Sequence, residues 1–172
     1  MSGAVAIRPL GAADLPDYKR LRDDMLVAHP EAFTSDAASE ASREPLDYLE
    51  RLGLDRRDGG HFVLGAFRSG RLVGAIGCER ELRPKVRHVG HLIGMMVRAE
   101  ARGCGVGAQL VAACIAEGRR AGLELLTLSV TAGNVEAVRL YERQGFIVYG
   151  RLLRALKIDS TYHDKLHMAL AL

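Results

Sequence analysis

The sequence of 172 residues has no tryptophan, 5% aromatic residues and three cysteines. Because Cys78, Cys104 and Cys114 are odd in number and lack a CxxC spacing, they argue against a disulfide framework or a zinc ribbon and indicate a reducing compartment. No uncharged apolar run approaches the roughly 18 residues that span a bilayer, and Arg8 interrupts any signal-peptide core. We therefore expect a soluble, unprocessed, cytoplasmic protein with no membrane partner.

A strong charge of either sign is also absent, since the net charge is +3. With so few aromatic side chains to stack on bases, this small excess does not favour binding to single-stranded nucleic acid. The basic cluster of Arg80, Arg83, Lys85 and Arg87 keeps a nucleic-acid-binding protein open as a less favoured alternative, although such clusters are more often solvated turns. We expect no nucleic-acid partner, because a small ligand that carries phosphate explains the charge equally well.

No repeat, low-complexity tract or long linker divides the sequence, so we expect a single domain over residues 1–172. The polar stretch 29–43 is expected to be a long loop. Apolar periodicity and capping residues predict strands at 4–10, 61–67, 72–82, 86–97, 123–130, 146–149, 152–158 and 162–170, and helices that begin at Asp14, Pro45, Val106 and Asn134. This order predicts an α/β fold (mixed α+β) whose mixed sheet has helices on both faces.

The stretch RGCGVGA, residues 102–108, lies between a predicted strand and a predicted helix. A glycine-rich turn at a helix N-terminus presents unpaired backbone N–H groups and the positive end of the helix dipole, which together bind phosphate groups. A Walker loop would need GKS or GKT after Gly107, and the dinucleotide-binding fingerprint would need a third glycine at its own spacing. With these two motifs excluded, the pattern that remains is an arginine at position 102 followed by glycines at positions 105 and 107.

This pattern and the later stretch GNVEAVRLYERQGF resemble two motifs of the GNAT superfamily of acyl-CoA-dependent N-acyltransferases, the second of which is NxxAxxLYxxxGF. The resemblance covers essentially the whole chain. It implies the GNAT fold, a central, mixed and mostly antiparallel sheet of about seven strands flanked by about four helices. It also implies an N-acetyltransferase that moves an acetyl group from acetyl-CoA to an amine-bearing substrate by direct attack in a ternary complex.

The resemblance further implies which residues hold coenzyme A. Residues that wrap its pyrophosphate are Gly103, Cys104, Gly105, Val106, Gly107 and Ala108, with Arg102 adding positive charge. The Cys104 side chain is expected to be incidental. Met95, Met96 and Val97 would line the strand edge along which the pantetheine arm lies. A bulge near Gly94 would open the slot for the thioester, and a backbone N–H near Met96 would polarise its carbonyl group.

For the chemistry, the resemblance points to Tyr141 as the general acid that protonates the leaving thiolate. Asn134 lies two helical turns earlier on the same helix face, and it is either an N-cap or a coenzyme A contact. His91 is the first choice for the general base, because its ordinary pKa near 6.5 suits proton abstraction at neutral pH. Glu79 and Glu81, acting through water, are the alternatives.

Two further signals bear on the substrate and on metals. Ribosomal N-terminal acetyltransferases carry a glutamate where this chain has Ser129, which puts that substrate class in doubt. His163 and His167 form an HxxxH pattern on a predicted strand, where the spacing does not converge on one ion, so we expect no metal.

The acceptor is expected to bind under the 29–43 stretch, the first two helices and the loop before Tyr162. Acidic residues there would attract a cationic amine, unless they only form a solvated polar face: Asp23, Asp24, Glu31, Asp36 and Glu40. Polyamines, aminoglycosides, amino acids and protein amines all stay open as acceptors. A noncatalytic coenzyme A sensor is the alternative from another class, and pairing of exposed terminal strands would allow a homodimer.

Overall fold

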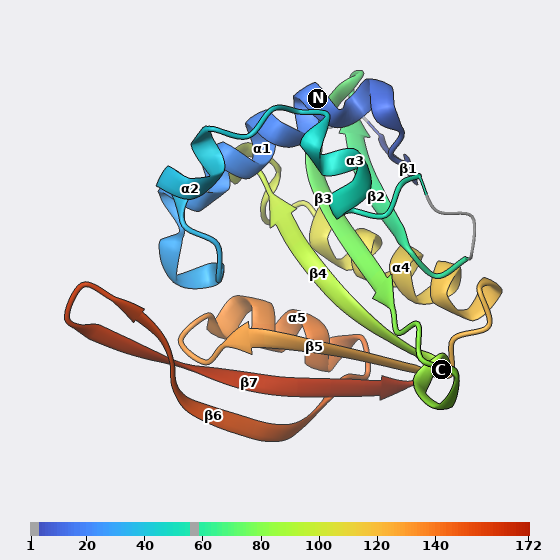
Figure 1. The fold of residues 1–172 in the computed structure, drawn as a ribbon, viewed down its shortest axis with the longest axis vertical. Helices are drawn as coiled ribbons and strands as arrows, with labels where there is room; N and C mark the ends of the chain where they lie inside the picture. The colour runs from blue at the N-terminus through green and yellow to red at the C-terminus, as the bar shows by residue number, and fades with distance from the viewer. Residues whose placement is uncertain (1–3, 56–58) are drawn as a thin grey trace.

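Seven strands form one sheet in the order β1-β2-β3-β4-β5-β7-β6 in the computed structural model, which describes residues 4–55 and 59–172 (Figure 1). The strands are β1 (Val5–Pro9), β2 (Phe62–Arg68), β3 (Arg71–Arg80), β4 (Val89–Val97), β5 (Leu125–Thr131), β6 (Ile147–Ile158) and β7 (Thr161–Ala171). Neighbouring strands are antiparallel except β4 and β5, which are parallel. The predicted fold class, a mixed and mostly antiparallel sheet with helices, is confirmed.

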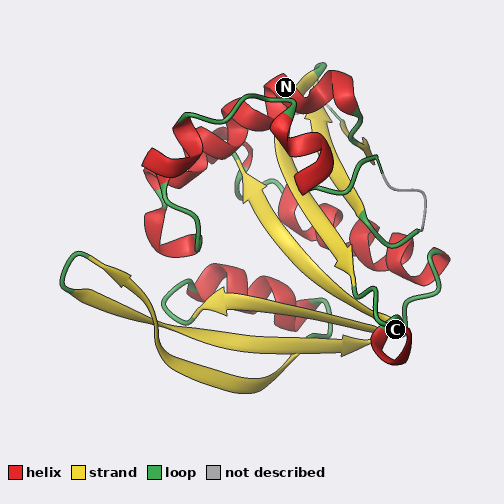
Figure 2. Ribbon diagram, viewed as in Figure 1, coloured by secondary structure: helices red, strands yellow, loops and turns green. Residues whose placement is uncertain are grey.

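Helices cover both faces of the sheet (Figure 2). They are α1 (Leu15–Ala28), α2 (Ala37–Ala41), α3 (Asp47–Arg51), α4 (Val106–Arg120) and α5 (Val135–Arg143). One core cluster packs α4 and α5 against the sheet, and a second packs α1 and α3 against the opposite face of β2 and β3. Because successive strand residues point to opposite faces, each of these two strands supplies side chains to both clusters.

Three expectations about the elements were wrong in detail. The 29–43 stretch is not one long loop, since it contains a 3-10 turn at 30–32 and helix α2. Asp14 stands at the N-cap position of α1, but its carboxylate does not cap that helix. It accepts hydrogen bonds from the Arg8 guanidinium and the Gly11 N–H, because these donors lie nearer.

The third correction concerns β6, which was expected as two strands broken near Gly150. It is one strand of 12 residues that stays paired to β7 through two register shifts. Asp164 of β7 binds the irregular part, accepting hydrogen bonds from the Arg154 N–H (2.8 Å) and the Arg151 guanidinium. These contacts replace ladder bonds that the shifts remove, so the strand continues where the local sequence indicates a break.

The basic cluster beside β3 has a structural role in part. The Arg80 guanidinium donates to the carbonyl oxygens of Ala121 (2.9 Å), just after α4, and Arg87 (2.8 Å). These bonds tie the end of β3 to the end of α4. No helix in the described ranges combines the length and apolar character needed to cross a bilayer.

Candidate functional site

The two parallel strands at the centre of the sheet separate soon after they begin. β4 and β5 are paired only over Val89–His91 and Leu125–Thr127, and beyond this point they diverge (Figure 1). On its other side β4 contains the predicted bulge, because two residues, Gly94 and Met95, lie opposite a single residue of β3. Gly94 has a φ of +58°, which favours glycine. The predicted opening between the strands is therefore confirmed.

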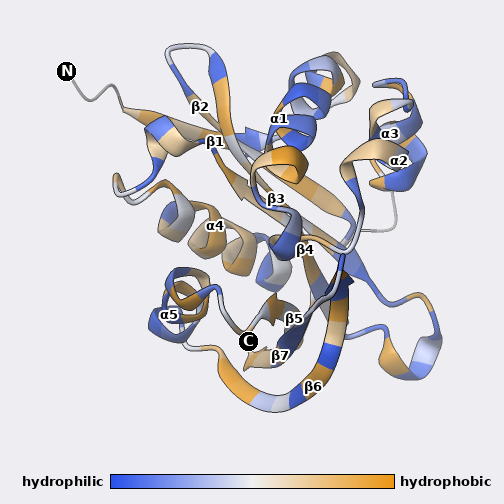
Figure 3. Ribbon diagram, turned by 90° about the vertical axis from the view of Figure 1, so that its left-hand side faces the viewer, coloured by the Kyte–Doolittle hydropathy of each residue, from blue (hydrophilic) through white to orange (hydrophobic). Residues whose placement is uncertain are grey.

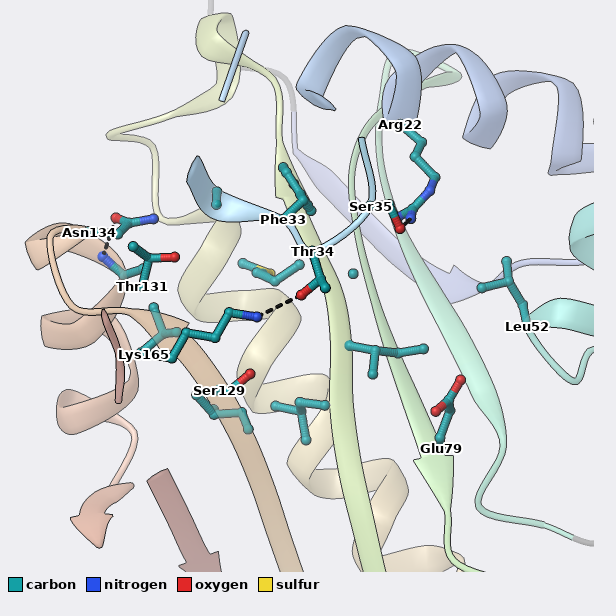
Figure 4. Close-up of a pocket in the computed structure, with 18 of the residues that line it drawn as sticks. Arg22, Phe33, Thr34, Ser35, Leu52, Glu79, Ser129, Thr131, Asn134 and Lys165 are labelled. Carbon is teal, nitrogen blue, oxygen red and sulfur yellow. Dashed lines mark hydrogen bonds between the residues drawn. The ribbon is translucent and has the colours of Figure 1, made fainter. Parts of the chain in front are cut away.

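A cavity of about 350 Å³ lies at this opening (Figure 4). Its floor comes from the bulged part of β4 and from β5, and α5 forms one wall. The segment from residue 30 to residue 52, here called the roof, covers it together with α1. The polar residues used below all line the cavity: Arg22, Thr34, Ser35, Arg51, Glu79, Asn134, Tyr141 and Lys165.

The glycine-rich stretch forms the start of α4, as predicted. Gly105 is the N-cap residue with a φ of +76°, and no side chain caps the helix. The first helical hydrogen bond runs from the Gln109 N–H to the Gly105 oxygen (3.0 Å), so the N–H groups of the preceding turn have no helical partner. The space that a Cβ at Gly103 would enter is open. The backbone here can accept an anion at close range.

Arg102 is oriented differently from the expectation that it simply adds charge to this turn. Its Nε donates to the Val97 oxygen (3.1 Å), and its guanidinium lies 2.8 Å from Nε2 of His29 at the end of α1. The side chain therefore links the turn to β4 and to α1. The neighbouring Cys104 is exposed, which agrees with an incidental side chain.

The strand residues predicted to border the cofactor are divided between the two faces of the sheet. Met95 lines the cavity, together with Ile93 and Gly94. Met96 is 2% exposed and its side chain packs in the opposite core, with α1 and α3. Val97 packs at the edge of the α4 core. Only the backbone of Met96 was assigned a role, so this placement leaves that prediction untested.

Tyr141 reaches the cavity from α5. It is 6% exposed, and its ring packs edge-on against Phe146, with centroids 5.8 Å apart. Burial raises the pKa of its hydroxyl above the ordinary tyrosine value. The phenol therefore keeps its proton at neutral pH, which is the state that a proton donor needs.

Asn134 has the first of the two roles that the sequence left open, that of an N-cap. Its Oδ1 accepts a hydrogen bond from the Ala137 N–H (3.2 Å), so it is the N-cap of α5. The residue also lines the cavity (Figure 4). The capping role is confirmed, while contact with coenzyme A stays a prediction.

His91, the first choice for the general base, lies outside the residues that line the cavity. Its Nδ1 is hydrogen-bonded to Thr127 Oγ1, and its Nε2 lies 3.2 Å from Glu81 Oε1. The hydrogen bond from His91 lowers the pKa of Glu81 below the usual range. Both ring nitrogens are thus engaged, one with a residue of β5 and one with a residue just after β3.

Glu79 is the acidic residue that the structure brings into the cavity. It is the cross-strand partner of His91, so the two side chains lie on the same face of the sheet. Among the described residues that line the cavity, no other is acidic. The sequence predicted Glu79 only as an alternative base. The available signal was the alternation of side chains along β3, which decides the face of the sheet to which Glu79 points.

The roof is held by one buried carboxylate, which sequence reasoning placed on an acidic surface. Glu40, on α2, is 2% exposed and accepts hydrogen bonds from Arg22 (2.8 Å), Arg51 (2.7 Å) and the Tyr48 hydroxyl (2.6 Å). Burial alone would raise the pKa of Glu40, but these donors lower it to about 2. Ser35 accepts a further bond from Arg22 (3.0 Å). α1, α2 and α3 therefore meet at one ionic cluster.

Most of the acidic residues that were expected either to attract a cationic amine or to form a solvated polar face contact cations or a helix end. Asp23 pairs with Lys19, and Asp24 lies 2.7 Å from the Arg98 guanidinium. Asp36 accepts a hydrogen bond from the Ser39 N–H (2.9 Å) and so caps α2. Because these carboxylates and Glu40 already bind cations or a helix end, they leave little free negative charge above the cavity.

Lys165, on β7, is the cavity residue that sequence reasoning did not foresee. Its Nζ donates to Thr34 Oγ1 (2.7 Å), across 131 positions of the chain (Figure 4). A second bond, from Thr131 Oγ1 to the Glu31 oxygen (2.6 Å), ties the same part of the roof to β5. Burial lowers the pKa of Lys165 below the ordinary lysine value. The loop before Tyr162, expected to cover the slot, does not line it.

Metal ligands do not converge in this region. Among residues 4–55 and 59–172, no three histidine, cysteine, aspartate or glutamate side chains are grouped so that they could hold an ion. His163 and His167 lie on β7, paired with β6 residues.

Comparison with known proteins gives a family. Residues 19–146, most of the chain, match the sequence model described as the acetyltransferase (GNAT) family. Over 154 residues the chain is 27% identical to the L-methionine sulfoximine/L-methionine sulfone acetyltransferase of Pseudomonas aeruginosa, an alignment that covers 87% of this chain and 84% of that protein.

Solved structures with the same fold include two with informative descriptions. One is yncA from Salmonella typhimurium, solved with its cofactor acetyl-CoA, with a TM-score of 0.86, 19% identity and coverage of 98% of this chain and 94% of that one. The other is a ribosomal-protein-alanine N-acetyltransferase from Brucella melitensis, with a TM-score of 0.79, 27% identity and coverage of 97% and 99%.

Proposed function

This chain belongs to the acetyltransferase (GNAT) family, and from this premise we propose that it transfers the acetyl group of acetyl-CoA directly to a primary amine bound in the same cavity. The predicted family, enzyme class and use of acetyl-CoA are confirmed by the match. The observation that carries the proposal is that Glu79, Tyr141, Asn134 and the bulged β4 line one cavity of about 350 Å³. This volume lies within the roughly 300–1,000 Å³ of small-molecule sites.

The residues present fit the thioester carrier. The turn before α4 offers N–H groups without helical partners to a pyrophosphate, and the open space at Gly103 lets an anion approach. The separation of β4 from β5 leaves strand-edge groups beyond His91 for the amides of a pantetheine arm. Acetyl-CoA supplies the acetyl group as a thioester, and the backbone near Met96 would donate to the oxygen that gains negative charge.

Tyr141 would protonate the departing thiolate. Its buried hydroxyl keeps its proton at neutral pH because its pKa is raised, and α5 holds it at the wall of the cavity. Glu79 would accept the proton of the acceptor amine, directly or through a water molecule. We favour Glu79 over His91 as this base, because Glu79 lines the cavity whereas both ring nitrogens of His91 bind neighbours.

The acceptor is proposed to be a small amine of amino-acid size. Two findings support this class: the volume of the cavity, and the name of the Pseudomonas relative, which acts on methionine derivatives. The Brucella structure favours a second class, the N-terminal alanine of a protein, but this chain has Ser129 where the resemblance puts the glutamate of such enzymes.

The experiment is an acceptor panel with acetyl-CoA, followed through the thiol that is released. It contains L-methionine sulfone, the standard amino acids, a polyamine, an aminoglycoside and a peptide that begins with alanine. Turnover of a small amino acid derivative supports the proposal, and exclusive turnover of the peptide contradicts it. A coenzyme A sensor would bind acetyl-CoA in calorimetry and release no thiol with any acceptor.

A homodimer and a cytoplasmic location belong to the same proposal. β6 is one of the two edge strands of the sheet and exposes apolar side chains, among them Ile147, Tyr149 and Leu153. Parts of its ribbon carry the hydrophobic colour in Figure 3. A second copy that covers this strand would remove these side chains from water. Light scattering on the purified protein measures the mass of the particle, and a monomer at every concentration would contradict the dimer.

A further inference from the structure

The cavity holds more positive than negative side-chain charge. Arg22, Arg51 and Lys165 line it, whereas Glu79 is the acidic residue of the lining. Glu40 lies behind the two arginines and binds both. Positive side-chain charge around the cavity therefore exceeds negative charge, and Arg43, which also binds Glu40 (3.3 Å), adds to the excess.

Among the described residues that line the cavity, Lys165 is the cation without a carboxylate partner. Both arginines are bound to Glu40, whereas Lys165 has no carboxylate within salt-bridge distance in the described part of the chain. The next residue, Asp164, binds Arg151. A partly buried ammonium without a counter-ion is costly, and binding of an anion relieves that cost.

The geometry around the ammonium suits a carboxylate. One of its three N–H donors is used by Thr34 Oγ1 (2.7 Å), so two are left for a ligand. The Thr34 hydroxyl accepts the lysine bond and still has its own hydrogen to donate. Thr34 and Lys165 both line the cavity, and Figure 4 shows the lysine reaching toward the roof. Such a charged, hydrogen-bonded contact favours an acid group over a neutral one.

We propose that Lys165, with Thr34, binds the carboxylate of the acceptor, so that the enzyme selects amines that also carry an acid group. This deepens the proposed function and rests on it. The carboxylate of an α-amino acid would supply a negative charge beside this ammonium. Polyamines and aminoglycosides carry only positive groups and would leave Lys165 unpaired.

The phosphates of the cofactor are the other source of negative charge. Residues 103–108 do not line the cavity, whereas Lys165 bonds to the roof, on the acceptor side. We therefore assign the lysine to the acceptor. Kinetics distinguish these two roles of Lys165. Loss of an acceptor contact raises the KM of the acceptor, whereas loss of a phosphate contact raises the KM of acetyl-CoA.

The test compares L-methionine sulfone with its carboxamide, which keeps the amine and side chain but lacks the charge. We expect Lys165→Met to lower kcat/KM for the acid by about 10- to 100-fold relative to the wild type. For the carboxamide, kcat/KM should stay within about threefold of the wild-type value. Lys165→Arg should recover part of the loss. Lys157→Met is the matched control, since Lys157 is an exposed β6 lysine that contacts the Tyr162 ring and should leave both acceptors unchanged.

Three results would overturn the assignment: equal losses for acid and carboxamide, a rise confined to the KM of acetyl-CoA, or wild-type enzyme that prefers the carboxamide. If no small amine is acetylated, neither these two compounds nor any in the acceptor panel, the proposed function fails separately, and ligand binding then tests the carboxylate subsite. Calorimetry with coenzyme A present should then show the wild-type protein binding the acid at least tenfold more tightly than the carboxamide, a difference that Lys165→Met removes. Equal affinities would reject the carboxylate subsite.

Discussion

The turn that begins α4 and the roof, which includes α2 and α3, present charge by different means. The turn presents the N–H groups and the positive dipole end of a helix N-terminus, with Gly105 in a left-handed conformation. The roof uses side chains, with Glu40 buried among Arg22, Arg51 and Tyr48. A backbone site keeps its form when surface side chains change, whereas the roof depends on every member of its cluster. Mutations in the turn should therefore change the KM of acetyl-CoA, whereas mutations in the roof should change the free energy of unfolding.

Tyr141→Phe should have the largest effect, because it removes the proposed proton donor at the α5 wall of the cavity. We expect kcat to fall by about 10²- to 10⁴-fold with little change in acetyl-CoA affinity. Steady-state kinetics and calorimetry measure the two quantities. Tyr149→Phe, at an exposed tyrosine of β6, is the control and should be silent. An unchanged kcat in the Tyr141 variant would refute its role as the acid.

Glu40→Gln tests the roof by removing the counter-ion of the buried Arg22 and of the more exposed Arg51. We expect the free energy of unfolding to fall by about 3–5 kcal/mol, because breaking a buried ion pair uncovers an uncompensated charge. Urea unfolding measures this loss. Glu142→Gln, at an exposed position of α5, should change stability by less than about 0.5 kcal/mol. A roof variant as stable as the wild type would show that the cluster does not hold these helices.

The same carboxylate predicts how stability depends on pH. The pKa of Glu40 is about 2 in the folded protein and 4.5 in its ordinary state. Its contribution is therefore fully present above about pH 4.5 and is lost as the pH falls toward 2, with a size of about 3 kcal/mol. Urea unfolding between pH 6 and pH 2 should show the difference between wild type and Glu40→Gln narrowing over this window. A constant difference would argue against the lowered pKa.

Gly105→Ala tests the turn, with the smallest expected effect. A Cβ at Gly105 meets no close atom, but a φ of +76° strains alanine by about 1–2 kcal/mol. We expect a several-fold rise in the KM of acetyl-CoA from the distorted turn. Gly70→Ala is the matched control, with a φ of +77° and open space in a hairpin turn, and it should cost similar stability without changing KM. If both variants had the same KM for acetyl-CoA, the turn would have no role in binding the cofactor.

The turn was predictable from sequence because backbone sites need contiguous residues. Gly103, Gly105 and Gly107 stand at alternate positions at the start of a helical pattern, so one short stretch specifies the whole feature. The Asn134 cap and the bulge at Gly94 were predictable for the same reason. The family motifs added the role of Tyr141, which local physics alone does not give.

The roof was hidden because its contacts join distant positions. Glu40 binds partners 18, 8 and 11 residues away, and Lys165 binds Thr34 across 131 residues. Periodicity describes only neighbours within a helix or strand, so it indicated a polar loop and an acidic surface here. The buried state of a charged side chain depends on tertiary packing and leaves no local signal.

The bulge in β4 also decides which layer each side chain joins. Leu92 packs in the core with α4 and α5, yet Met96, an even number of residues later, packs in the core with α1 and α3. Regular alternation would have placed both on one side. The extra residue at Gly94 lets a single strand change sides halfway along its length. Deleting Gly94 would turn the side chains of the strand residues that follow it, 95–97, to the opposite faces of the sheet. The number of residues in this strand is therefore as constrained as its composition.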